Sequence, residues 1–195
     1  MMRAVHKHFD DSPVEFEHFA ADMWLNSDPH VASVEVTRPS RDGGRDAIGE
    51  FRIGPEVDPV RLQFALEAKC YDPDGGGVGV KSVSRLIARI KHREFGVFVT
   101  TAYIGAQAYQ EVREDQHPIV FMTGRDLVEV LRRMGLSDEK SLATYLSTQY
   151  PLTPAAHQVG AVDVAVPTEP IVVDSAPAIH AKLEAAIDNE ATFNV

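Results

Sequence analysis

The strongest constraint on the fold is the apolar segment from Phe64 to Lys69, whose only charged residues are Glu67 and Lys69. Side chains two residues apart on a β-strand point to the same face of the sheet. An acid and a base side by side in an apolar strand are costly to bury unless other groups pair with them or bind them. We therefore expect a central strand at residues 60–71 whose two charged side chains belong to a functional site.

A further acid follows a sharp corner earlier in the chain. Residues 41–46 read Arg-Asp-Gly-Gly-Arg-Asp, and glycine supplies the unusual backbone angles that such a corner needs. Asp46 follows the corner, at the start of a predicted strand. Asp42 precedes the corner and is expected either to form the turn or to contact the residues that bind the metal. Two carboxylates that converge with a lysine suggest a divalent cation held by oxygen ligands, with an ammonium beside the reacting group.

The rest of the chain alternates helical and strand patterns, which predicts an α/β sandwich with a mixed sheet. Ser12, Pro13 and Glu15 give the first helix its start signals, with Ser12 and Glu15 expected to form a capping box. The expected helices are 12–26, 80–92, 102–114, 123–134 and 137–149, and the expected strands are 31–37, 45–53, 60–71, 95–101 and 118–122.

The expected domain covers residues 12–149, preceded by a flexible N-terminus at residues 1–11. Residues 150–178 are rich in Pro, Ala and Val, as linkers often are. Residues 179–195 contain apolar residues at every fourth position, which predicts a short amphipathic helix. That helix either folds back on the domain or docks onto a partner.

The order of these motifs resembles a known nuclease family. Gly43-Gly44-x-Asp46, then Glu67-x-Lys69, then a basic helix and the strand Gly96–Thr101, are similar to the Mrr-like branch of the PD-(D/E)xK nucleases. The likeness is greatest to the nuclease domain of modification-dependent restriction endonucleases, and it spans residues 16–131. It implies a restriction-endonuclease-like three-layer sandwich, with a mixed central β-sheet flanked by helices.

The resemblance also implies roles for individual residues. Asp46, Glu67 and Lys69 would be catalytic, and Asp46 and Glu67, with the main-chain carbonyl of Ala68, would hold Mg²⁺, which Mn²⁺ can replace. In this superfamily a glutamate of the first helix sometimes reaches the metal, and the Phe-Glu pair at residues 16–17 matches that pattern. Glu17 is therefore expected either at the metal site or on a solvated helix face.

The charge distribution allows a nucleic-acid substrate despite a formal net charge of −10. Residues 38–93 contain eleven Lys and Arg against eight Asp and Glu, so this part carries +3 while the rest carries −13. Lys81, Arg85 and Arg89 recur every fourth residue, and we expect them to form a basic ridge on the side of their helix away from the core. These residues, with Arg41 and Arg45 at the glycine corner, are the expected contacts to DNA phosphates.

Composition excludes several other classes. No apolar run approaches the length of a membrane span, so we expect a cytoplasmic protein with no membrane partner. The single cysteine, Cys70, is expected to pack in the core, and the eight histidines are too scattered for a zinc site. The glycine-rich loop at residues 72–77 lacks the Lys-Ser/Thr ending of a P-loop.

The expected function is Mg²⁺-dependent DNA cleavage, in bacterial restriction or defence against phage. In the family that this chain resembles, specificity usually resides in a separate reader domain. Here the reader is expected to be another protein, a separate subunit reached through the tail, or absent. Cutting both strands needs two nuclease domains, so a homodimer or a larger complex is expected. The alternatives are a DNA-repair or RNA-directed nuclease of the same fold, and a non-catalytic nucleic-acid-binding or assembly subunit.

Overall fold

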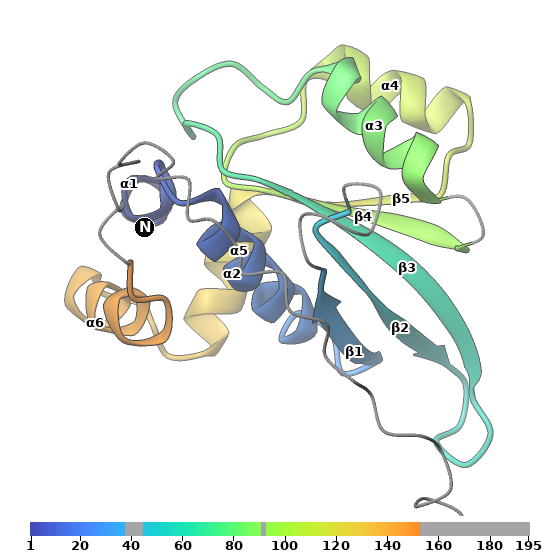
Figure 1. Cartoon of the computed structure of the whole chain (residues 1–195), viewed down its shortest axis with the longest axis horizontal. Helices are drawn as coiled ribbons and strands as arrows, with labels where there is room; N and C mark the ends of the chain where they lie inside the picture. The colour runs from blue at the N-terminus through green and yellow to red at the C-terminus, as the bar shows by residue number, and fades with distance from the viewer. Residues whose placement is uncertain (38–44, 91–92, 153–195) are drawn as a thin grey trace, which may run out of the picture. The chain divides into compact units, whose positions relative to one another are not determined.

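The computed structural model describes residues 1–37, 45–90 and 93–152, which lie in a compact unit spanning Met1–Pro154. Its described strands form one sheet in the order β1-β2-β3-β4-β5 (Figure 1). The pairs β1–β2 and β2–β3 are antiparallel, while the pairs β3–β4 and β4–β5 are parallel, so the sheet is mixed as expected. The strands are β1 (Val31–Val36), β2 (Ala47–Ile53), β3 (Val60–Lys69), β4 (Phe95–Thr100) and β5 (Ile119–Met122).

Helices cover both faces of this sheet and make three layers (Figure 1). The core on one face is built with α1, α2, α5 and α6, and the core on the other face with α3 and α4. The helices are α1 (Met2–Phe9), α2 (Pro13–Leu25), α3 (Val80–Ile90), α4 (Ala106–Glu114), α5 (Gly124–Arg133) and α6 (Glu139–Gln149). None of the helices in the described ranges is long and apolar enough to cross a bilayer.

The central strands are buried because both of their faces are covered. Residues 64–68 of β3 and 96–100 of β4 are buried without interruption. Such continuous burial is typical of parallel strands between two helical layers, and it explains why their sequences are nearly all apolar. A charged side chain in the middle of β3 must therefore find its partners inside the protein.

The N-terminal segment differs from the flexible start expected for residues 1–11. Residues 2–9 form α1, in which Val5 and Phe9 are fully buried. The ring of Phe9 packs against those of Phe16, Phe19 and Tyr150, at centroid distances of 5.7, 5.1 and 5.7 Å. The i, i+4 spacing of Val5 and Phe9 is the signal that indicates this helix.

The C-terminal boundary of the domain also differs from the expected one, because Tyr150 belongs to the core. Its ring is buried and its hydroxyl donates a hydrogen bond to Asp22 Oδ2 at 2.6 Å. The expected linker therefore cannot include residue 150. The predicted linker beyond residue 152 and the predicted helix at residues 179–195 lie outside the described residues.

Two further local expectations are wrong. The hydroxyl of Ser12 makes no capping hydrogen bond, because this residue adopts φ −135° and ψ 65° rather than an extended cap conformation. The helix expected from residue 102 begins at residue 106, because the preceding segment pairs with Val78 through hydrogen bonds from the Val78 amide to Tyr103 and from the Gly105 amide to Val78.

We predict that Phe9→Ala lowers the free energy of unfolding by about 3–5 kcal/mol, because it leaves a cavity among the aromatic rings of the core built with α1, α2, α5 and α6. Lys7→Ala, at an exposed position of the same helix, is the control and should change stability by less than about 0.5 kcal/mol. Urea denaturation measures both. Equal stability of the two variants would show that α1 does not belong to the cooperative unit.

Candidate active site

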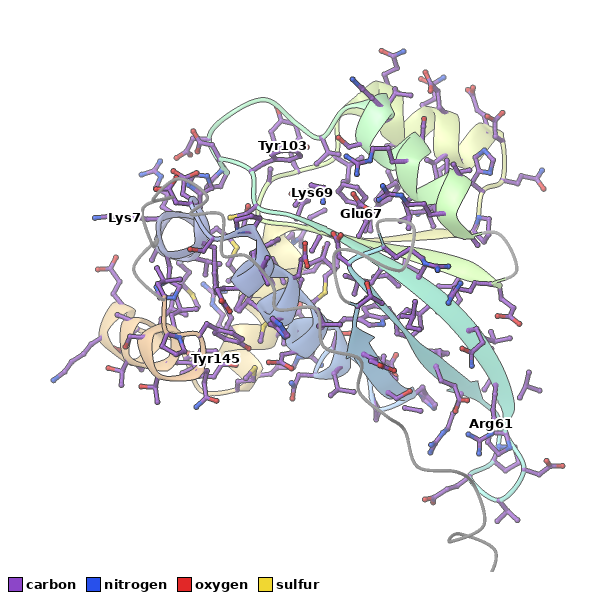
Figure 2. All side chains as sticks on the ribbon, in the orientation of Figure 1. Lys7, Arg61, Glu67, Lys69, Tyr103 and Tyr145 are labelled. Atoms are coloured by element: carbon purple, nitrogen blue, oxygen red, sulfur yellow. The ribbon has the colours of Figure 1, made fainter. Side chains whose placement is uncertain are left out.

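Glu67 and Lys69 lie on the face of β3 that α3 covers. Their strand neighbour Ala65 belongs to the core beneath α3 and α4, while Phe64 and Leu66 belong to the core on the opposite face. The alternation of a strand therefore directs both charged side chains toward α3. Figure 2 shows them close together on this side of the sheet.

Asp46 is positioned by the backbone of the same strand. Its main-chain amide donates to the Leu66 carbonyl at 3.1 Å, and its Oδ2 accepts a hydrogen bond from the Ala68 amide at 2.7 Å. The hydrogen bonding between β2 and β3 thus continues to Asp46, the residue before β2. There the Ala68 amide donates to the Asp46 carboxylate, whereas within a sheet it would donate to a main-chain carbonyl. A hydrogen bond to an ionised acceptor is stronger than a neutral one, so the carboxylate is held firmly.

Lys69 joins the two acids. Its Nζ donates to Asp46 Oδ2 at 3.1 Å and to the Ala68 carbonyl at 2.7 Å, and it lies 3.0 Å from Glu67 Oε1. Burial acts to lower the pKa of Lys69, but the charges of Asp46 and Glu67, together with side-chain hydrogen bonds to both acids, outweigh burial and raise that pKa above its ordinary value. The side chain is therefore an ammonium at neutral pH.

Glu67 is the most deeply buried member of the site, with its side chain 1% exposed. Arg89 of α3 donates from Nη1 to Glu67 Oε2 at 2.7 Å, and Arg85 Nη2 lies 3.9 Å from Oε1. Oε1 is fully buried, and the ammonium of Lys69 lies 3.0 Å from it. One oxygen of this carboxylate is thus fixed by a guanidinium, while the other pairs with Lys69.

The position of Arg89 corrects the expectation of a basic ridge pointing away from the core. Its side chain is 20% exposed and contacts a buried acid, whereas the side chain of Arg85 is 54% exposed and Lys81 lies at the surface. The ridge was expected from the periodicity of α3 alone, which does not show what the helix packs against. A buried carboxylate on the preceding strand needs a cation from a neighbouring element, and this need is the sequence signal for the contact with Arg89.

Glu17 of α2 lies half-buried and within electrostatic reach of the site. Burial is the main cause that raises its pKa to about 7, and the negative charge of Asp46 raises it further. Lys69 opposes this rise and Glu67 adds to it. A fully solvated helix face, the alternative expectation for Glu17, therefore does not describe its environment.

The remaining predicted residues are Arg41, Asp42, Arg45 and Cys70. Arg41 and Asp42 lie outside the described residues. Arg45 directly precedes Asp46, and its carbonyl accepts a hydrogen bond from the Thr37 hydroxyl. Cys70 packs against the core built with α1, α2, α5 and α6, and burial raises the pKa of its thiol to about 11, which agrees with the expected packing role.

The donor atoms fit a hard divalent cation. Asp46, Glu67 and the carbonyl of Ala68 offer only oxygen, the ligand type preferred by Mg²⁺ and Mn²⁺. The buried Oε1 of Glu67, which no guanidinium holds by a hydrogen bond, is a suitable ligand atom. The described residues contain no group of three or more His, Cys, Asp or Glu placed to hold a metal, so a cation here would need main-chain and water oxygens besides the two carboxylates.

Comparison with known proteins shows the family of this chain. The Mrr catalytic-domain family model, described as a restriction endonuclease, matches residues 10–131, which is more than half of the chain. The chain belongs to this restriction endonuclease family. The expected family and the restriction-endonuclease-like α/β fold are therefore confirmed.

Two solved restriction endonucleases resemble this family member. The DNA modification-dependent restriction endonuclease AspBHI is 46% identical, with a TM-score of 0.69 over 75% of this chain and 38% of its own. The MspJI restriction endonuclease, solved in complex with a 27-mer oligonucleotide, is 27% identical, with a TM-score of 0.62 over 76% of this chain and 35% of its own. The chain thus spans little more than a third of either relative. No curated protein matches it.

The raised pKa of Glu17 predicts a pH-dependent stability in the absence of metal. Because the folded protein holds this proton up to about pH 7, against an ordinary pKa of 4.5, wild-type stability should fall as pH rises through that interval. Glu17→Gln has no such proton to lose. We expect the Tm of Glu17→Gln minus that of the wild type to grow from about pH 5 to about pH 7 and then level off.

Thermal melts in EDTA measure this difference. Glu15→Gln, on the same helix, controls for the general effect of removing a carboxylate from α2. A Tm difference that stays constant with pH would contradict the raised pKa.

Proposed function

We propose that this restriction endonuclease domain hydrolyses DNA phosphodiester bonds with the help of Mg²⁺, for which Mn²⁺ can substitute. The observation that carries the proposal is the convergence of Asp46, Lys69 and the buried Glu67 at the end of β3. An acid at this depth is costly unless it binds or pairs, and its oxygen Oε1 is fully buried beside the Lys69 ammonium, at 3.0 Å. The family match supports nuclease activity, and the site supplies the residues for it.

Each residue has a distinct task in this chemistry. Asp46 and Glu67, with the Ala68 carbonyl, would hold the cation, which when bound activates water and offsets the charge of the scissile phosphate. Lys69, kept charged by its two acidic neighbours, would orient the attacking water or donate to the phosphate oxygens as negative charge develops. Glu17 lies close enough to respond to the charge of the site and is a further candidate ligand once it has lost its proton.

Basic residues around the site would hold the DNA backbone. Arg45 beside Asp46, and Lys81 and Arg85 on the exposed side of α3, are proposed to contact phosphates, as is Arg41. Such contacts fix the position of a duplex without reading its sequence. The net charge of −10 makes binding to free DNA weak, so a partner that recruits the DNA would strengthen it.

We also propose a setting for this activity. AspBHI is a DNA modification-dependent enzyme, and MspJI was solved with an oligonucleotide. The chain spans 38% and 35% of these relatives, and we propose that the reading of modification comes from a separate reader domain or subunit. Cleavage of both strands would use a homodimer or a larger complex. Restriction of foreign DNA in the bacterial cytoplasm is the role that this arrangement would serve, and residues 179–195 would dock the partner.

We expect cleavage of plasmid DNA in Mg²⁺ to fall by about a hundredfold or more in Lys69→Ala, because a preorganised electrostatic donor is lost. Asp46→Asn and Glu67→Gln should lose cleavage to a similar degree. Lys140→Ala, at an exposed position of α6, is the matched control and should cut like the wild type. Methylated, unmethylated, branched and single-stranded substrates, with an RNA, would identify the substrate class.

Undiminished cutting by Glu67→Gln would refute the assignment of the site. Failure of the wild type to cut any substrate would favour a non-catalytic subunit, or a nuclease that depends on its reader.

For the DNA contacts, we expect Arg85→Ala to weaken binding by a similar factor on all duplex sequences. The slope of log K against log salt concentration should decrease in magnitude by about one, because one phosphate contact is lost. Fluorescence anisotropy with Ca²⁺ in place of Mg²⁺ measures both quantities. An effect confined to one sequence would instead indicate base contact by Arg85.

A further inference from the structure

The two oxygens of the Glu67 carboxylate have different surroundings. Oε2 accepts a hydrogen bond from Arg89 Nη1 at 2.7 Å, whereas Oε1 pairs with Lys69 Nζ at 3.0 Å and lies 3.9 Å from Arg85 Nη2. Lys69 also donates to Asp46 at 3.1 Å, so Oε1 is the oxygen that contacts the same ammonium as the second acid of the site. The guanidinium therefore sets which oxygen is turned toward the place where a cation would bind.

Arg89 is well suited to this task. It comes from α3, a different element from the strand that carries the acid, so it can fix the rotation of the carboxylate from outside. Its side chain is 20% exposed, and that of Glu67 is 1% exposed. A hydrogen bond between charged groups is strong at such depth, and removal of one partner leaves a buried charge uncompensated.

We propose that Arg89 is a positioning residue for the metal site, which orients Glu67 by holding Oε2 and leaves Oε1 to bind the divalent cation. This inference rests on the proposed nuclease function. It replaces the DNA-phosphate contact that the sequence pattern assigned to Arg89, since the guanidinium is directed at a buried acid. Partners of metal-binding side chains typically change metal affinity by 10–100-fold when they are removed.

The first test uses stability and needs no activity. Arg89→Met should lower the Tm of the metal-free protein by roughly 10 °C, because Glu67 loses a charge partner. In a Glu67→Gln background, which has no such charge, Arg89→Met should change the Tm by less than about 2 °C. An equal loss of Tm in both backgrounds would overturn the proposal, because Arg89 would then act independently of Glu67.

The second test is calorimetric titration with Mn²⁺ at fixed pH. We expect Arg89→Met to bind Mn²⁺ at least about tenfold more weakly than the wild type, and Arg89→Lys, which keeps the charge, to recover part of the loss. Lys140→Met, at an exposed position of α6, is the control and should keep the wild-type affinity for Mn²⁺.

The outcomes separate this proposal from the proposed function. Wild-type protein that fails to bind Mn²⁺ would refute the metal-dependent function and, with it, the role of Arg89. Wild-type binding with unchanged affinity in Arg89→Met would refute only the role of Arg89. Weaker DNA binding by Arg89→Met in Ca²⁺, with normal Mn²⁺ affinity, would restore the phosphate contact in its place.

Discussion

The burial of one carboxylate, that of Glu67, determines the arrangement around the candidate site. An ionised acid that is 1% exposed in the middle of a sheet is tolerated only when charged partners surround it. Lys69 on the same strand and Arg89 on the covering helix provide that compensation, at 3.0 and 2.7 Å. Burying such a group lowers the stability of the fold. This is common at functional sites, which must keep polar groups in places where packing alone would favour apolar ones.

The mixed topology of the sheet brings these partners together. β2 runs antiparallel to β3 and therefore delivers Asp46 to the C-terminal end of β3. The connection from β3 to the parallel strand β4 passes through α3, which returns over the sheet and places Arg89 above Glu67. α2 contacts β1 and β3 and carries Glu17 within electrostatic range. Four separate segments thus meet at one end of a central strand.

Features set by local pattern could be predicted from the sequence, and features set by contacts between distant segments could not. The period of two in β3 places Glu67 and Lys69 on one face, and the glycine corner indicates that Asp46 lies at the start of a strand. The contact of Arg89 with Glu67 depends on how α3 crosses the sheet, and helical periodicity does not predict that crossing. Tyr150 likewise enters the core through its bond to Asp22, 128 residues earlier.

The most direct test of a metal-dependent site is anomalous diffraction from crystals of the protein soaked with Mn²⁺. We expect an anomalous peak bound by Asp46, by Oε1 of Glu67 and by the carbonyl of Ala68, with Arg89 still holding Oε2. No peak at this position in crystals soaked at saturating Mn²⁺, with Lys69 still joining the two acids, would contradict a metal-dependent active site here.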